Sequence, residues 1–273
     1  ILLFLSRTKH ARKTEQYYAL ILSRMDELLA GRYVDTLTRR DLEHFRDRLR
    51  KEWHLSAYSI NRYTGKLIAA WRWCASEDFL ESVPWAKYRH LPEEKRTHWC
   101  GNFDDFRRVY TLCNPALQWA VRTCLALCLR PGKELISLSW QDVDLTHGKA
   151  SIWMPKTQRQ KTVYCPAWWV TEARVRAEGK DAGDPVCPAP RGGRYTQINS
   201  SWDSLRRRAG ITDCPLYTVR HMAASLMLEA GADIAAVAAQ LGHKDVTTTG
   251  AFYTHAVAGA QEKAAQDIPE LPS

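Results

Sequence analysis

The sequence lacks any apolar run long enough to cross a membrane. Ile1 to Leu5 is too short, and the apolar run from Cys124 to Leu129 ends at the charged Arg130. A transmembrane helix needs about 20 consecutive apolar residues. We therefore expect no membrane span in this sequence and no membrane partner.

Cysteine pairs of the C-x-x-C type are also missing, although the sequence has eight cysteines. Cys124 and Cys128 lie four residues apart in an apolar helical pattern, where small core side chains are typical. No second ligand pair completes a zinc site. We expect structural, reduced thiols, as in a protein of the cell interior.

A phosphate-binding loop of the G-x-x-x-x-G-K-[ST] type is absent, because Pro131-Gly132-Lys133 is followed by Glu134. This excludes a P-loop NTPase. Asp142 and Asp144 are candidate ligands of a two-metal nuclease. However, no further carboxylate cluster accompanies them, and Asp142 fits a turn better.

The sequence is instead rich in positive charge. Its net charge is +9 and its isoelectric point is near 9.2, with 45% hydrophobic and 10% aromatic residues. The stretch up to His98 holds 19 Lys and Arg against 13 Asp and Glu, so it contributes +6. Both halves are basic, which argues against a single basic tail. An anionic partner is indicated, of which nucleic acid is the commonest.

The first part of the sequence predicts an all-helical domain over residues 1–92, with 1–12 as the remnant of a linker. Apolar residues recur at helical spacing from Tyr18 onward. Thr38 with Asp41, and Ser56, are good starts for two further helices. One polar face of the last helix is a candidate DNA-contacting face. Its residues are Asn61, Arg62, Lys66 and Arg72.

Pro84, Pro92 and the charged run 93–96 indicate a linker, so a second domain is predicted over 93–273. A helix from Phe103 and a buried helix ending near Arg130 come first. Two strands, 150–154 and 162–165, flank a polar loop, 156–161, that holds the three cations Lys156, Arg159 and Lys161. Helices return from Thr218. The predicted fold class is mainly α, with a small antiparallel sheet in the second domain.

The last quarter of the sequence carries the candidate chemistry. Arg220 begins a helix, Leu241-Gly242-His243 follows, and Tyr253 lies ten residues beyond that histidine. Arginine and histidine can stabilise charge on a phosphate, and a phenol can attack phosphorus. Taken singly, a histidine such as His243 is more often found at a helix end, and a tyrosine such as Tyr253 is more often a half-buried aromatic.

Three separated stretches together resemble the tyrosine recombinases, also called phage-type integrases. The stretches are LRPGKEL at 129–135 running into LSWQDVD at 138–144, the hairpin that begins at Lys156-Thr157, and the C-terminal set YTVRH at 217–221, LGH at 241–243 and YTH at 253–255. Their order and spacing match the family. The helices of 1–92 resemble its core-binding domain, so the resemblance covers nearly the whole sequence.

The resemblance implies a role for each matching residue. The family's two arginines fall on Arg130 and Arg220, its hairpin lysine on Lys156, its His/Trp position on His243 and its nucleophile on Tyr253. The usual histidine of H-x-x-R is Tyr217 here. A phenol can bind a phosphate oxygen but lacks the acid–base chemistry of imidazole. Arg130 and Glu134 are separated by one more residue than expected, which predicts a longer turn.

The resemblance also implies a function: a site-specific DNA recombinase, acting through a 3′-phosphotyrosyl link without cofactor or metal. The implied partners are double-stranded DNA attachment sites, a homotetramer on them and accessory DNA-bending proteins. The location would be a bacterial cytoplasm, at the nucleoid. The tail 256–265 would dock on a neighbouring protomer.

Three roles stay open at this point. The sequence begins with Ile1 rather than methionine, and a missing N-terminal piece favours the integrase of a phage or other mobile element. A housekeeping recombinase that resolves chromosome dimers is the first alternative. A DNA-binding homologue that has lost catalysis is the second, because Tyr217 replaces histidine.

Overall fold

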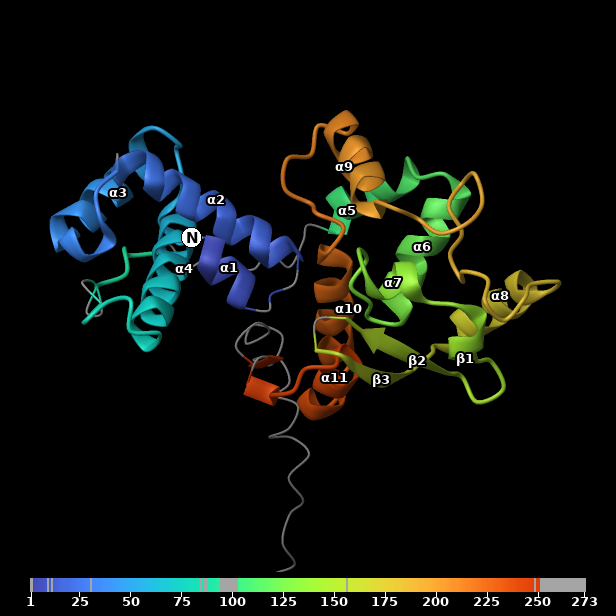
Figure 1. Ribbon diagram of the computed structural model, residues 1–273. Helices are drawn as coiled ribbons and strands as arrows, with labels where there is room; N and C mark the ends of the chain where they lie inside the picture. The colour runs from blue at the N-terminus through green and yellow to red at the C-terminus, as the bar shows by residue number, and fades with distance from the viewer. Residues whose placement is uncertain are drawn as a thin grey trace, which may run out of the picture. The chain divides into compact units, whose positions relative to one another are not determined.

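The computed structural model describes residues 2–8, 10, 12–29, 31–83, 85, 88–93, 103–155, 157–247 and 249–250. The chain forms two compact units, Ile1–Thr97 and His98–Ser273 (Figure 1). The predicted boundary at 92/93 stays a prediction, since 94–100 fall outside the described residues. No helix within the described ranges is long and apolar enough to span a bilayer.

The first unit is all-helical. It contains α1 (Leu2–Arg7), α2 (Arg12–Leu29), a short 3-10 turn (Val34–Thr36), α3 (Arg39–Lys51) and α4 (Ala57–Ser76). Thr38 and Asp41 form the predicted capping box of α3, with the Thr38 amide donating to the Asp41 carboxylate at 2.7 Å. The Ser56 hydroxyl accepts from the Ser59 amide at the start of α4. These caps satisfy N–H groups that would otherwise lack partners.

The prediction that residues 1–12 are only a linker remnant is wrong. Leu2–Arg7 is helical, and Phe4 is buried. Its ring packs edge-on against Tyr18 at 5.0 Å and Trp73 at 5.4 Å. The short apolar run at the start of the chain therefore serves the core of this unit, because burying an aromatic ring stabilises the fold more than exposing it.

Asn61, predicted on the exposed polar face of α4, is buried. Its amide donates to the Leu91 carbonyl at 2.9 Å and to the Glu93 carboxylate at 2.6 Å, and its oxygen accepts from the Leu91 amide at 2.8 Å. Trp85 is also buried and stacks on Trp71. The described part of 85–93 is thus fixed to the first unit, and the predicted free linker does not begin at Pro84.

The second unit combines helices with one small sheet. Its helices are α5 (Phe103–Thr111), α6 (Pro115–Ala126), α7 (Glu134–Ser137), α8 (Ala167–Ala177), α9 (Ile198–Arg208), α10 (Thr218–Glu229) and α11 (Ile234–Leu241). The sheet consists of β1 (Val143–Asp144), β2 (Lys149–Met154) and β3 (Arg159–Tyr164), antiparallel in the order β1-β2-β3. The predicted fold class is confirmed.

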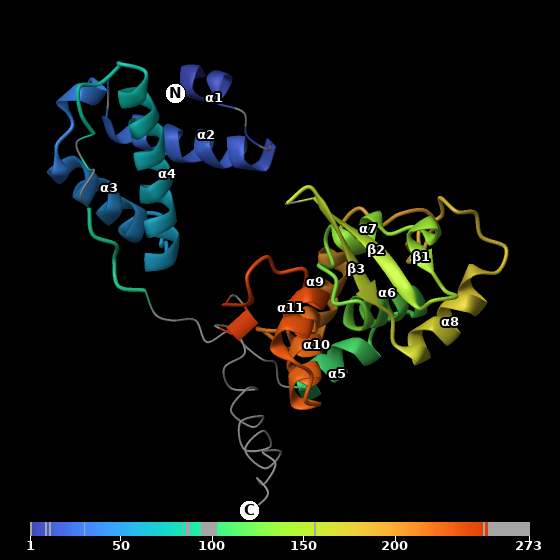
Figure 2. The same cartoon turned by 90° about the horizontal axis from the view of Figure 1, so that it is seen from below.

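Two contacts between elements of this unit prepare the site. Helix α10 lies beside α6, and α11 lies beside β3 (Figures 1 and 2). The sheet register pairs Met154 with Arg159 and Ile152 with Lys161. Lys161 therefore belongs to a strand, and the prediction that it lies in a polar loop is wrong.

Three fully buried tryptophans hold the core of this unit. Trp119 and Trp169 stack at 5.6 Å, and each indole N–H has a partner: the Val186 carbonyl for Trp119 and the Thr123 hydroxyl for Trp169. The Trp202 N–H donates to the Cys214 carbonyl. A buried indole whose N–H is satisfied gives a rigid core, and the ends of α6 and α10 are built on this core.

The cysteines in this core are structural, as predicted. Cys124 and Cys128 are buried, and burial raises the pKa of the Cys128 thiol to about 11. Among the described residues there is no group of three or more His, Cys, Asp or Glu that could hold a metal ion.

Candidate active site

Arg130 lies in the tight turn between α6 and α7. The turn begins at Cys128, which has a left-handed φ of 51°. The Arg130 carbonyl accepts the Glu134 amide at 3.1 Å, and the Glu134 carboxylate accepts the Arg130 amide at 3.0 Å. The same carboxylate binds the Arg130 guanidinium. The extra residue predicted to lengthen this turn is therefore accommodated by a closed pair between Arg130 and Glu134.

Glu134 is the centre of the site, and sequence reasoning did not assign it a role. Its side chain is 1% exposed. One of its oxygens lies 3.6 Å from an Arg220 nitrogen and 3.7 Å from the Lys161 ammonium, besides the bond to Arg130. One carboxylate is thus shared by three cations, and the cluster keeps a net positive charge. Such an excess favours an anion.

Arg220 is the third residue of α10 and is 1% exposed. Its guanidinium donates to the Cys128 carbonyl at 2.6 Å and to the Leu241 carbonyl. Burial, and then the neighbouring Arg130 cation, lower the pKa of Arg220 below its ordinary value. An arginine stays charged even so. The side chain is locked by carbonyl acceptors, which fixes the direction of its remaining N–H groups.

Lys161 was missed as a site residue. It points inward from β3 and donates to the carbonyls of Gln240 at 3.1 Å and Leu241 at 3.3 Å. Burial, and then the Arg220 cation, lower the pKa of Lys161 to about 8. Strand alternation in the sequence indicated the face of Lys161, since it shares a face with the apolar Val163, but it did not indicate the carbonyls and the carboxylate that Lys161 meets there.

His243 follows the end of α11. Gly242 ends the helix in the left-handed conformation, with φ 71°, and the His243 amide donates to the Ala238 carbonyl. The His243 Nδ1 lies 2.8 Å from the Thr249 hydroxyl. Burial, and then the cations of Arg220 and Arg130, lower the pKa of His243 to about 4. The imidazole is therefore neutral near pH 7. If Nδ1 accepts from Thr249, Nε2 carries the proton and is a donor.

Tyr217 stands directly before α10 and is 43% exposed. Its ring meets that of His221 edge-on at 5.2 Å. Partial burial by itself would lower the pKa of Arg130. The Glu134 carboxylate and then Tyr217 outweigh burial, so the pKa of Arg130 is raised above its ordinary value. The structure thus brings together Arg130, Tyr217, Arg220 and His243. Lys156 and Tyr253 lie outside the described residues, and their places in the site stay predictions.

The two-metal alternative loses its ligands to local structure. The Asp142 carboxylate accepts the Ser139 amide at 2.9 Å in a capping box. Asp144 accepts the amides of Thr146 and His147, and its other oxygen lies 2.7 Å from the His147 ring. Both carboxylates therefore serve turns.

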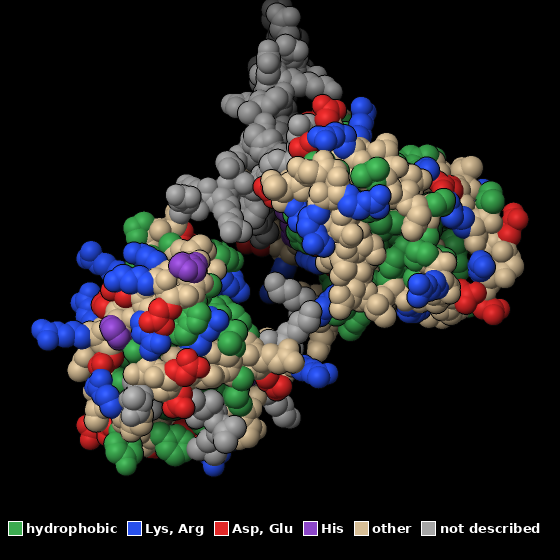
Figure 3. All heavy atoms as spheres, turned by 90° about the horizontal axis from the view of Figure 1, so that it is seen from above, with side chains coloured by type: hydrophobic (Ala, Val, Ile, Leu, Met, Phe, Trp, Pro, Cys, Tyr) green, Lys and Arg blue, Asp and Glu red, His purple; other side chains and the backbone are tan. Residues whose placement is uncertain are grey.

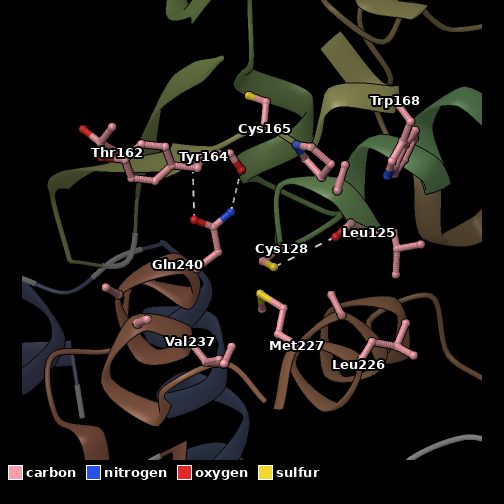
Figure 4. Close-up of a pocket in the computed structure, with 16 residues that line it drawn as sticks. Leu125, Cys128, Thr162, Tyr164, Cys165, Trp168, Leu226, Met227, Val237 and Gln240 are labelled. Atoms are coloured by element: carbon pink, nitrogen blue, oxygen red, sulfur yellow. Dashed lines mark hydrogen bonds between the residues drawn. The ribbon is translucent and has the colours of Figure 1, made fainter. Parts of the chain in front are cut away.

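One cavity of the second unit is unsuited to binding phosphate. A cavity of about 660 Å³ lies between α6, α10, α11 and the end of β3 (Figure 4). Its walls are mostly apolar, including Leu125, Leu226, Met227 and Val237. At its rim the Gln240 amide pairs with the backbone of Tyr164. Among the described residues, no cationic side chain lines this cavity, so the cluster around Glu134 is the better anion site.

The predicted DNA-contacting residues fall on two sides of α4. Arg62 is exposed and donates to the Tyr58 hydroxyl at 3.0 Å, and the Lys66 ammonium lies 4.9 Å over the Tyr18 ring. Arg72 is exposed beside Tyr88 instead. Helical geometry separates Lys66 and Arg72 by roughly 120°. In the view of Figure 3, basic and acidic side chains are interspersed on both units.

The chain shares sequence and fold with known recombinases. The model of the phage integrase family matches residues 103–259, which is more than half of the chain. Tyrosine recombinase XerC of Xylella fastidiosa (strain 9a5c) is 34% identical over 129 residues, 45% of this chain and 42% of that protein. The chain thus matches less than half the length of this curated relative.

Solved structures of integrases share the fold. A lambda integrase dimer bound to a COC′ core site superposes with a TM-score of 0.75 at 16% identity, covering 91% of each chain. The Tn1549 transposon integrase in complex with a circular intermediate DNA superposes with a TM-score of 0.77 at 15% identity, covering 96% of each chain. The match of the family model over the region that contains Arg130, Arg220 and His243 shows that this chain belongs to the phage integrase family, the tyrosine recombinases.

Proposed function

We propose that this chain cleaves and rejoins duplex DNA at specific sites, with Tyr253 as the nucleophile. The observation that supports it most is the convergence of Arg130 and Arg220 on one buried carboxylate, with His243 beside them. Two guanidinium groups held this way offer planar forks to the non-bridging oxygens of a phosphodiester.

The proposed reaction exchanges one phosphodiester for another. The Tyr253 oxygen attacks phosphorus, a 3′-phosphotyrosyl bond forms and the bond to the 5′-oxygen breaks. The phenol proton passes to water as the new bond forms, because a free tyrosine is only roughly one part in a thousand phenolate at neutral pH, a deficit of about 4 kcal/mol. Lys156 protonates the leaving 5′-oxygen. Attack by a 5′-hydroxyl on the phosphotyrosyl link reverses the step and rejoins the strand.

The described residues supply the charge that this reaction needs. Arg130, Arg220 and Lys161 carry three positive charges against the single negative charge of Glu134. A transition state with two negative charges on the phosphoryl group would neutralise the remaining excess. Removing one preorganised donor from such a site typically costs about 2.7–4 kcal/mol. Neutral His243 donates from Nε2 to a phosphate oxygen, and Tyr217 adds a phenol donor at the mouth of the site.

We further propose that the biological role is integration of a mobile element, with a homotetramer acting on two DNA sites. The similarity to the lambda and Tn1549 integrases supports this role. The similarity to a XerC protein supports the alternative, a recombinase that acts on the host chromosome. The products distinguish them, since an integrase joins a circular DNA to a chromosome, and a resolving enzyme converts one dimeric circle into two.

The first experiment traps the covalent intermediate on DNA of randomised sequence, so that the target site need not be identified beforehand. The chain is incubated with a pool of nicked duplexes, and DNA that stays attached after denaturing washes is recovered and sequenced. Recovered duplexes are then tested singly on a denaturing gel. We expect a covalent band for the wild type and none for Tyr253→Phe, because the mutant lacks the attacking oxygen.

The control is DNA binding by the same two proteins in a gel-shift assay, which Tyr253→Phe should leave within about threefold. If both proteins bind duplex DNA and neither forms a covalent band, the proposed function is wrong. The chain would then be a DNA-binding homologue without catalysis.

A further inference from the structure

Two side chains join the strand β3 to the helix α11. The side-chain oxygen of Gln240 accepts a hydrogen bond from the backbone N–H of Tyr164 at 3.1 Å. The side-chain nitrogen of Gln240 donates to the Tyr164 carbonyl at 2.8 Å, and the dashed lines in Figure 4 mark both bonds. Lys161 donates to the carbonyls of Gln240 and Leu241 at 3.1 and 3.3 Å. The last turn of α11 is therefore held twice: Gln240 binds the edge of β3, and Lys161 binds the carbonyl groups at the end of the helix.

The Leu241 carbonyl is shared between two cations, Lys161 and Arg220. It belongs to the C-terminal end of α11, where carbonyl groups lack partners within the helix and the helix dipole is negative. Cations are favourable there. On its other side the Lys161 ammonium lies 3.7 Å from Glu134. Lys161 thus links the end of α11 directly to the centre of the arginine cluster.

The stem of Lys161 also packs against the residue that precedes His243. A Cβ added to Gly242 would lie 2.7 Å from the Lys161 Cδ and 2.9 Å from the Met154 sulfur. Contacts under 3.0 Å do not occur for real Cβ atoms, so only glycine lets the chain pass this close to Lys161. The path of the backbone into His243 is set by this packing.

We propose that Lys161 is a positioning residue of the reaction centre, which fastens the end of α11 to Glu134 and so holds His243 against the two arginines. The inference rests on the function proposed above, and it assigns to a buried strand residue a role in that function. Lys161 is not the proton donor of the reaction, because its side chain is 5% exposed and its N–H groups already serve two carbonyls.

The charge of Lys161 matters as well as its length. The titratable and charged groups that face it come from every neighbouring element: Glu134 on α7, Arg220 on α10, Arg130 and Cys128 around the end of α6, and His243 after α11. Burying a lysine among cations is unfavourable, and the pKa of about 8 expresses this. Above that pH the neutral amine still donates to the carbonyls but loses its attraction to Glu134.

The first test is the pKa of His243, measured by NMR on the full chain with ¹³C-labelled histidine. The signal is assigned with His243→Gln. We expect a pKa of about 4 for His243 in the wild type and a pKa above about 5, towards the ordinary value, in Lys161→Met. Lys161→Arg keeps the positive charge and should leave the pKa of His243 low. Lys149→Met, the same change on the neighbouring strand β2, is the matched control and should change nothing.

The second test is the rate of covalent complex formation on a recovered duplex between pH 6 and 9.5. Groups that titrate alike in the wild type and in Lys161→Met cancel in the ratio of the two rates. Above pH 7.5 His243 is neutral in both proteins, so the pH dependence of the ratio there reports Lys161. We expect a ratio of about 10 to 100 below pH 7.5, since misplacement by 1 Å can cost that much, and a fall of the ratio above pH 8. The ratio of the Lys161→Arg rate to the Lys161→Met rate should not change with pH, because arginine keeps its charge over this range.

Two results overturn the proposal. One is a His243 pKa that is the same in Lys161→Met and the wild type, which needs no DNA and therefore does not depend on the proposed function. The other is a rate ratio below about three, or one that is constant with pH, which would reduce Lys161 to a structural role. Absence of any covalent band in the wild type would count against the proposed function instead, and the NMR result would still decide this inference.

Discussion

The carboxylate of Glu134 holds Arg130 at two points, the backbone amide at 3.0 Å and the guanidinium. One side chain thereby fixes both the position of the arginine backbone and the direction of its fork. Glu134 is almost fully buried and also lies near Arg220 and Lys161. Among the ion pairs of the described residues, it is the only carboxylate that contacts these three cations. The geometry of the site depends on this residue.

Glu134→Gln should lower the free energy of unfolding by about 2 to 4 kcal/mol, because it leaves three cations together without their counter-charge. Urea denaturation measures this. Glu172→Gln is the matched control: Glu172 pairs with Arg122 and Arg176, whose side chains are 41% and 40% exposed. The control should cost less than about 1 kcal/mol. Equal losses in the two variants would contradict a special role for Glu134.

Gly242→Ala tests how closely the chain packs on Lys161. Gly242 has φ 71°, and its added Cβ would meet Lys161 and Met154. Gly210→Ala has the same backbone strain, with φ 69° and nothing within 4 Å of the added Cβ. Strain alone should cost about 1 kcal/mol in both. Gly242→Ala should cost at least about 1 kcal/mol more, as overpacking does, by urea denaturation. A loss no greater than that of Gly210→Ala would show that Lys161 simply moves away.

The depressed pKa of Lys161 predicts how stability depends on pH. The folded state has a pKa of about 8 and the unfolded chain the ordinary 10.5, so between these values the folded state binds fewer protons. Stability therefore rises with pH in this window, and the full cost of burying the charge is present below pH 8. The difference in unfolding free energy between wild type and Lys161→Met should change by about 3 kcal/mol from pH 7.5 to 10.5. A constant difference would contradict the depressed value.

The basic residues of α4 can be ranked by salt dependence of DNA binding. Arg62→Ala and Lys66→Ala should each weaken binding for all sequences and reduce the slope of log K against log salt by about one, if each meets a phosphate. Arg72→Ala, on another side of the same helix, is the internal comparison. A loss confined to Arg62 and Lys66 would assign DNA to their side, and an equal loss in all three would contradict a single contact face.

The sequence was most informative where function needs particular residue types at fixed spacing. Arg130, Arg220 and His243 were predicted as site residues, and the structure places them around one cluster. The caps at Thr38 and Ser56 and the end of α11 at Gly242 were also predictable, because local backbone chemistry determines them. The predictions failed for Phe4, Asn61 and Lys161, whose burial depends on partners far away in the chain.

The sequence alone determined the family, the helical character of the first unit and the identity of the candidate nucleophile Tyr253. Local propensities and the ordered motifs are contained in short stretches, so they can be read without a fold. Only the tertiary structure decided that Glu134 and Lys161 belong to the site. Lys161 lies on β3 and binds the end of α11 about 80 positions further along, and Glu134 lies on α7 and faces Lys161 of β3 and Arg220 of α10. A charge is buried among cations only when packing between such distant elements supplies its acceptors, and no local pattern records that.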